Sequence, residues 1–157
     1  MIEIVRLSED HDRLEELLAL IMSSFAYMNG VIDPPSSAHG LTTETLAEKI
    51  KAEIAFVTVE NETLLGCVFC RPEPNSLYIG KLAVAPAAQG RGVGFALYQR
   101  AEETARKLGL TALRLETRVE LVDNHRRFAS WGFVRSAENA HPGFTRTTSI
   151  EMTKHLV

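Results

Sequence analysis

The segment Leu82–Gly94, LAVAPAAQGRGVG, constrains the fold more than any other part of the chain. An apolar run that reads as a strand from Ser76 to Ala85 leads into three glycines at alternate positions, and an amphipathic helix follows from Gly92 to Leu108. The next apolar segment, Thr111–Thr117, reads as a further strand. A strand, a crossover helix and a strand form a right-handed unit in which the two strands run parallel. The sequence therefore predicts one parallel strand pair inside a larger sheet.

The remaining segments predict antiparallel pairing around this unit. The predicted strands are Ile2–Leu7, Glu53–Glu60, Thr63–Cys70, Phe133–Glu138 and about residues 146–154. The predicted helices are one that Ser8 caps and that ends near Asn29, one that starts at Thr42 or Thr43, and one that ends near Ser130, while VIDPPSSAHG reads as a loop without regular structure. We therefore expect an α+β fold with a mixed, mostly antiparallel sheet of about seven strands, helices on both faces, and strands four and five as its parallel βαβ unit. Residues 1–157 should form a single domain.

The charge of the chain limits its partners. Seventeen Lys and Arg against twenty Asp and Glu give a net charge of −3, so no general basic field attracts nucleic acid or an anionic membrane. The N-terminus turns acidic too early for a signal peptide, and no apolar run is long enough to span a membrane. We expect a cytoplasmic protein. The five histidines show no metal-ligand spacing, so no metal is predicted.

Cys67 and Cys70 form a C-x-x-C pattern within LLGCVFCRP. Redox pairs of this kind usually lie at a helix N-terminus, which lowers the thiol pKa. This segment reads as a strand, which would send the two side chains to opposite faces of the sheet. We therefore expect two packed core thiols.

The glycine turn Gln89–Gly94 predicts an anion site. The first N–H groups of a helix lack partners and lie at the positive end of its dipole, glycines let a phosphate approach the main chain, and Arg91 adds a positive charge. A simple reversal of the chain is the plain alternative. A dinucleotide is a third, because Glu116 ends the next strand near the place of a ribose-binding acid. The spacing argues against it, since Phe95 stands where that motif has its third glycine.

Two motifs carry a family resemblance. The pattern V-x-P-x-x-Q-G-x-G-x-G from Val84 to Gly94, together with NHRRFASWGF from Asn124 to Phe133, resembles the GNAT superfamily of acyl-CoA-dependent N-acetyltransferases. The resemblance implies a CoA pyrophosphate on the glycine turn, pantetheine between strands four and five, and a Val84 N–H that faces the thioester carbonyl. The residues implied in binding are Leu82, Ala83, Val84, Gln89, Gly90, Arg91, Gly92, Val93, Gly94, Asn124 and Phe128.

The resemblance implies a reaction as well. A GNAT-like enzyme transfers acetyl from acetyl-CoA to a primary amine, which could belong to a polyamine, an amino acid, an antibiotic or a protein. An acyl-CoA-binding module without turnover is the alternative. Thiol release over a panel of amines would distinguish the two.

Several positions depart from the family pattern. Many relatives place a tyrosine, the acid for the CoA thiolate, where this chain has Phe128, and an asparagine where it has Leu121; Asn124 lies one turn later. Many carry a glutamate base at the position of Tyr78. A phenol with a pKa near 10 is a poor base, so we expect Tyr78 to orient the acceptor from the face that carries Val84, unless it is simply a half-buried strand tyrosine.

The remaining candidates belong to the acceptor side. Glu116 is either a base at the end of strand five or a solvated carboxylate. His39 and His141 lie in loops that could shape the acceptor entrance, or are solvated. A final strand with a free edge leaves a homodimer open.

Overall fold

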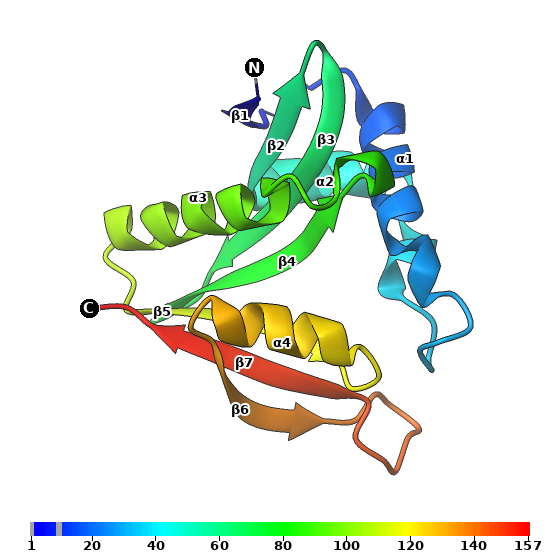
Figure 1. Cartoon of the computed structure of the whole chain (residues 1–157), viewed down its shortest axis with the longest axis vertical. Helices are drawn as coiled ribbons and strands as arrows, with labels where there is room; N and C mark the ends of the chain where they lie inside the picture. Colours follow the sequence, from blue (N-terminus) through cyan, green and yellow to red (C-terminus); the bar gives the residue numbers. More distant parts are fainter. Residues whose placement is uncertain (1, 9–10) are drawn as a thin grey trace.

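The computed structural model describes residues 2–8 and 11–157, and these form a mixed seven-stranded sheet in the order β1-β2-β3-β4-β5-β7-β6 (Figure 1). Strands β4 and β5 are parallel, and every other neighbouring pair is antiparallel. This confirms the predicted fold class. The strands are β1 (Glu3–Arg6), β2 (Ile54–Glu60), β3 (Thr63–Pro72), β4 (Ser76–Val84), β5 (Ala112–Arg118), β6 (Val134–Asn139) and β7 (Ser149–His155).

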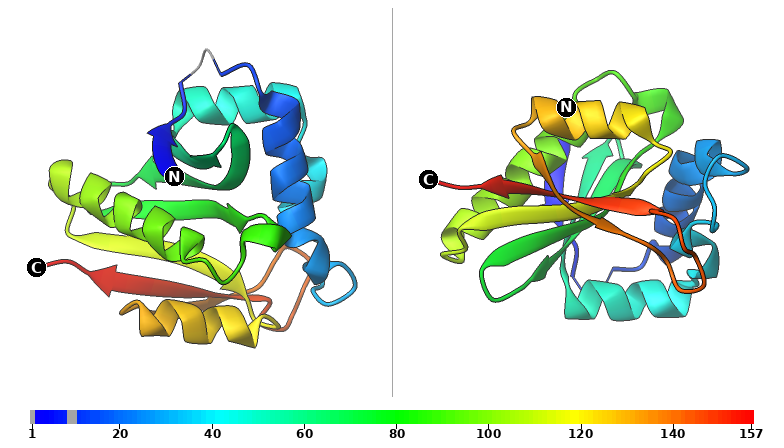
Figure 2. Two further views of the ribbon diagram at one scale, coloured as in Figure 1. Left: turned by 45° about the horizontal axis from the view of Figure 1, so that its top comes forward. Right: turned by 90° about the horizontal axis from the view of Figure 1, so that it is seen from below.

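Helices cover both faces of the sheet. Figures 1 and 2 show α1 and α2 on one face and α3 and α4 on the other. Each face has its own apolar core, with Cys67 in the core under α1 and α2 and Cys70 in the core under α3. The two thiols thus lie on opposite sides of the sheet, as predicted. The helices are α1 (Leu14–Phe25), α2 (Thr43–Ala52), α3 (Val93–Lys107) and α4 (Val122–Ser130). None of the helices in the described part of the chain is long and apolar enough to cross a membrane.

Some predicted boundaries are wrong. The helix predicted after Ser8 would include residues 9–10, which lie outside the described residues; the observed α1 begins at Leu14, with Arg13 as its N-cap. The loop VIDPPSSAHG contains a short 3-10 helix, Ser37–Gly40, because the Ser36 hydroxyl accepts a hydrogen bond from the Ala38 amide. Thr42 caps α2 through a capping box with Thr45. The helix was predicted to start at Thr42 or Thr43, and it starts at Thr43.

Strands β4 and β5 pair over only part of their length. The parallel register runs from Ser76↔Ala112 to Ile79↔Leu115, although β4 continues to Val84 and β5 to Arg118. Lys81 has a φ of +49°, and the register of β3 with β4 shifts at this level, so β4 carries a bulge there. Beyond the bulge the two strands diverge and open a gap in the hydrogen-bond ladder.

The bulge also overturns one prediction. Even spacing placed Tyr78 on the same face as Val84. In the structure Leu77 and Ile79 pack in the core under α3, so Tyr78 points to the other face, whereas the Val84 side chain packs against the core under α3. One extra residue at the bulge reverses the alternation between them. Tyr78 therefore lies on the face that α1 and α2 cover.

Gly66 shows how tightly the strands pack beneath the start of α3. A Cβ at this position would lie 2.9 Å from the Ala83 carbonyl oxygen and 2.9 Å from Val93 Cγ1. We expect Gly66→Ala to lower the free energy of unfolding by about 1–3 kcal/mol, as overpacked cores do. Gly40→Ala is the control, because a Cβ there has no neighbour within 4 Å. Urea unfolding of both variants tests this, and equal stability of the two would contradict it.

Candidate active site

A cavity of about 1220 Å³ lies between the diverging ends of β4 and β5. Its walls come from β4, the glycine turn, the end of β5, α4, α1 and the loop before α2. Three of the predicted candidates, Ala83, Arg91 and the loop histidine His39, do not line it. The structure thus brings together Tyr78, Leu82, Val84, Gln89, Gly90, Gly92, Val93, Gly94, Glu116, Asn124 and Phe128.

The glycine turn opens the N-terminus of α3 toward this cavity. Gly90 and Gly92 have φ values of +83° and +78°, a left-handed conformation that favours glycine. A Cβ at either position would have no neighbour within 4 Å, so the space over the main chain is free. Gly92 is the N-cap of α3 and supplies no capping side chain. The first N–H groups of α3 can therefore receive an anion.

Arg91 does not join this site. Its guanidinium donates to both carboxylate oxygens of Glu60, with distances of 3.0 and 2.9 Å. Glu60 ends β2, so the ion pair ties the glycine turn to the β2–β3 hairpin. The sequence did not reveal this partner because Glu60 is distant along the chain.

The Val84 amide has a partner that the sequence analysis missed. Val84 N–H donates to Ser24 Oγ over 3.1 Å, and Ser24, on α1, is 5% exposed and lines the cavity. Leu17, Ile21 and Ser24 share one helical face, so a hydroxyl on an otherwise apolar stripe was the available signal. The hydroxyl lies at the last residue of β4, well beyond the point where pairing with β5 ends at Ile79.

Tyr78 is held between two cations. The guanidinium carbons of Arg71 and Arg114 lie 4.7 and 4.5 Å from its ring centroid. Burial is the main cause that raises the pKa of the Tyr78 phenol, and the nearby Glu116 carboxylate adds to it. The phenol therefore stays protonated over the ordinary working pH range. It can donate a hydrogen bond, but it is not a base.

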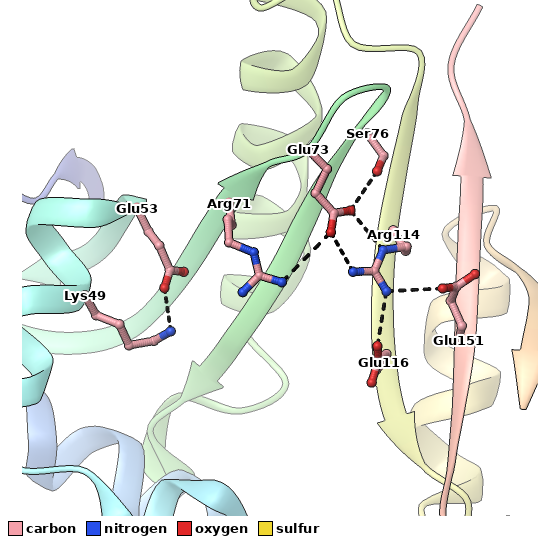
Figure 3. A network of polar contacts seen from close by, with 8 residues as sticks. All are labelled: Lys49, Glu53, Arg71, Glu73, Ser76, Arg114, Glu116 and Glu151. Atoms are coloured by element: carbon pink, nitrogen blue, oxygen red, sulfur yellow. Dashed lines mark hydrogen bonds and ion pairs between the residues drawn. The ribbon is translucent and has the colours of Figure 1, made fainter. Parts of the chain in front are cut away.

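Arg114 also gathers the acidic side chains of this region (Figure 3). It donates to Glu73 at 2.7 and 2.9 Å, to Glu116 at 3.1 Å and to Glu151 at 3.1 Å. Glu116 was predicted to be either a base or a solvated carboxylate. In the structure it is an ion-paired carboxylate whose side chain is 39% exposed and lines the cavity.

The α4 wall is largely aromatic. Phe128 packs edge-on against Trp131 and Phe133, with ring centroids 5.5 and 6.2 Å apart. Asn124 donates to the Tyr27 hydroxyl over 3.3 Å. Its amide therefore faces the short 3-10 helix Ala26–Met28, which follows α1, and it lies next to the apolar Phe128 surface.

Only one of the two loop histidines lies in the cavity wall. His141 lines the cavity and hydrogen-bonds to Thr148, whereas His39 bonds to Asn29 Oδ1 at 3.0 Å outside it.

Two basic residues that the sequence analysis overlooked, Lys81 and Arg118, also line the cavity. The signal for Lys81 in the sequence was that it is the one charged residue within the β4 segment SLYIGKLAV. In residues 2–8 and 11–157 no three His, Cys, Asp or Glu side chains are placed to hold a metal ion.

The fold and this cleft together define an acyltransferase of the GNAT type. Residues 15–133 match the sequence model of the acetyltransferase (GNAT) family, and the chain belongs to that family. The predicted family and enzyme class are therefore confirmed. A relative from Azospirillum brasilense, an "IAA acetyltransferase", is 31% identical over 109 residues, which cover 68% of this chain and 69% of the relative.

Solved structures show the same fold at low sequence identity. The PaiA N-acetyltransferase of Thermoplasma acidophilum in complex with coenzyme A has a TM-score of 0.84 at 19% identity, with 99% of both chains covered. A GNAT family acetyltransferase from Elizabethkingia anophelis with acetyl-CoA bound has a TM-score of 0.70 at 17% identity, with 99% of this chain and 98% of that chain covered.

The buried thiols provide a test of the C-x-x-C interpretation. Burial raises the pKa of Cys67 and of Cys70 to about 12, so at pH 8 only about one thiol in ten thousand is ionised. We expect the native protein to resist a thiol reagent such as dithionitrobenzoate at pH 8, and both thiols to react at once in denaturant. Absorbance of the released thiolate measures this, and rapid reaction of the native protein would contradict it.

Proposed function

We propose that this protein transfers an acetyl group from acetyl-CoA to a primary amine of a small molecule or protein by direct attack on the thioester. The observation that carries the proposal is the shared cavity. The open N-terminus of α3, the divergent edges of β4 and β5, and the Val84 amide all border it. A pyrophosphate, an extended pantetheine arm and a thioester can therefore be bound in succession.

In the proposed complex the CoA pyrophosphate accepts hydrogen bonds from the amides of residues 90–94. Gln89 flanks this cradle, and its side-chain amide faces the Val84 carbonyl oxygen at 3.5 Å. The pantetheine arm extends between the strands along Leu82–Val84, where β4 has no β5 partner. Phe128 and Asn124 border the arm from α4. Acetyl-CoA is thus the proposed co-substrate.

The proposed oxyanion site is the Val84 amide. The Ser24 hydroxyl accepts its hydrogen bond without substrate, and the thioester carbonyl oxygen would accept it during the reaction. A fixed amide of this kind typically contributes about 10²–10³ in rate. Because the β3–β4 ladder pairs Val84 with Gly66, the amide needs little reorganisation.

The proposed chemistry uses the acceptor's own proton. The neutral amine attacks the carbonyl carbon, the C–S bond breaks from the tetrahedral intermediate, and a proton from the amine nitrogen neutralises the CoA thiolate. Phe128 has no proton to give. Tyr78, protonated between two guanidiniums, donates a hydrogen bond that orients the acceptor.

A second candidate function is acyl-CoA binding without turnover. Phe128 favours it, because the usual acid position holds an apolar ring. The two candidates differ in one measurement. Release of free CoA thiol with any member of an amine panel supports the transferase, and tight CoA binding without release supports the binding module.

The glycine cradle predicts a specific response to cofactors. Acetyl-CoA at a hundredfold excess over its Kd should stabilise the protein by roughly 2.7 kcal/mol and raise its Tm, while NADH should not. Gly92→Asp should abolish the acetyl-CoA shift, because a carboxylate would meet the pyrophosphate.

The matched control for the cradle is Gly109→Asp. Gly92 and Gly109 have φ values of +78° and +74°, and a Cβ at either has no neighbour within 4 Å, so the backbone strain is similar. Gly109 follows α3 at its opposite end. Thermal shifts with each cofactor decide the question, and a normal acetyl-CoA shift in folded Gly92→Asp would place the cradle elsewhere.

The two aromatic positions predict separable kinetic effects. Tyr78→Phe should lower kcat/KM for the amine, because it removes the orienting hydroxyl, and leave the affinity for acetyl-CoA nearly unchanged. Phe128→Tyr should give little gain, far below the roughly 10²-fold of a limiting general acid. Steady-state kinetics with one active amine measures both. A large gain at Phe128 together with no loss at Tyr78 would refute this assignment.

A further inference from the structure

Two partly buried basic side chains on the walls of the cavity have no carboxylate partner in the described part of the chain. Among the described residues, Lys81 Nζ donates to Ser37 Oγ at 2.9 Å, and Arg118 donates to the Pro34 and Pro35 carbonyl oxygens at 2.6 and 3.0 Å. Neither forms an ion pair there, although both are partly buried and line the cavity. By contrast, the cavity-lining Lys49 is paired with Glu53 at 2.6 Å.

The nearby carboxylates form their ion pairs with other cations. Glu53, which faces Lys81, binds Lys49. Asp33 and Glu120, which face Arg118, lie 3.6 and 3.8 Å from Arg146. In residues 2–8 and 11–157 no carboxylate therefore forms a direct ion pair with Lys81 or Arg118.

Both side chains lie in surroundings that disfavour their charged forms. Desolvation is the main cause that lowers the pKa of Lys81, and the cations Lys49 and Arg118 lower it further. Desolvation also lowers the pKa of Arg118. An anion bound between these side chains would offset the unfavourable burial of both charges.

Hydrogen-bond donors remain for such an anion. A lysine ammonium has three N–H donors and an arginine guanidinium has five. The loop before α2 uses one donor of Lys81 and two donors of Arg118, so the others remain free of that loop. Carboxylate and phosphoryl oxygens are the acceptors that make strong, charge-assisted hydrogen bonds to these groups.

The two cations stand where an acceptor must pass. Ladder pairing ends at Ile79 and Leu115, and Lys81 and Arg118 follow on opposite walls of the opening. Lys81 precedes Val84 by three residues, about 10 Å along a strand. The long Lys81 side chain can cover part of this distance, so an amine with an acidic group a few bonds away can reach the Val84 amide while its anion contacts the cations.

We propose that the acceptor is an amine that also carries an anionic group, a carboxylate or a phosphoryl group, and that Lys81 and Arg118 bind this anion. The proposal rests on the proposed acetyl transfer and names its acceptor class. It excludes polyamines as preferred acceptors, because they would bring further positive charge to these residues.

The test compares acceptors that carry an anionic group with partners that lack it. Each of several amino acids is paired with its own carboxamide, and phosphoethanolamine is paired with ethanolamine, so that the two sources of the anion are separated. We expect kcat/KM to favour the acidic member of at least one series by about tenfold to hundredfold, the range for charge-assisted hydrogen bonds. Equal kcat/KM within every pair, or a preference for spermidine, would overturn the proposal.

Variants test which residues bind the anion. Lys81→Met and Arg118→Gln should each reduce the ratio of kcat/KM for the acidic acceptor to kcat/KM for its neutral partner by about tenfold or more. Lys107→Met, an exposed lysine in the last turn of α3, is the control. If these cations only secure the loop before α2, both members of a pair should lose activity equally, and this result would contradict the proposal.

A binding measurement separates this proposal from the proposed function. Calorimetry measures the binding of N-acetyl amino acids and of their carboxamides to wild-type protein, both free and loaded with CoA. This measurement requires neither turnover nor a variant. Preferential binding of the acids supports the anion site even if no amine is acetylated, whereas equal or absent binding of both overturns it. Failure to bind CoA or to release thiol counts against the proposed acetyl transfer alone.

Discussion

The premature end of the β4–β5 ladder is the constraint on which the site depends. A sheet that stays paired has no room between its strands, but here pairing stops at Ile79 and Leu115 while both strands continue. The bulge at Lys81 turns β4 away, and its antiparallel partner β3 follows with a shift in register. Because β3 keeps its pairing beyond the bulge, the divergent end of β4 remains rigid. The cavity therefore lies inside the sheet rather than on a mobile loop.

The same bulge places Tyr78 and Val84 on opposite faces of the sheet. Val84 and the glycine turn belong to the face of α3, whereas Tyr78 and its flanking arginines belong to the face of α1 and α2. Under the proposed function, CoA approaches from the first face and the acceptor from the second. Ser24 reaches across from α1 to the Val84 amide, so it connects the helix on the acceptor side to the proposed oxyanion site.

The sequence predicted features that depend on local pattern and missed those that depend on tertiary pairing. The glycine turn, the helix that follows it and the parallel strand pair all follow from periodicity and from the free N–H groups of a helix start. The ion pair of Arg91 with Glu60 and the Ser24–Val84 bond join distant segments, which no periodicity encodes. The face of Tyr78 was predicted wrongly because strict alternation assumes a strand without a bulge.

The distribution of charge along the cavity explains how a site without an evident base can act. Arg114 donates hydrogen bonds to Glu73, Glu116 and Glu151, and its guanidinium lowers the pKa of the Glu73 carboxyl, which makes Glu73 a weak base. Tyr78 remains a neutral donor. Under the proposed function, none of these side chains is assigned as the base, so the incoming ammonium loses its proton to solvent before the amine attacks. In the proposed reaction the protein therefore contributes position and a fixed amide, and the acceptor supplies its own proton to the departing thiolate.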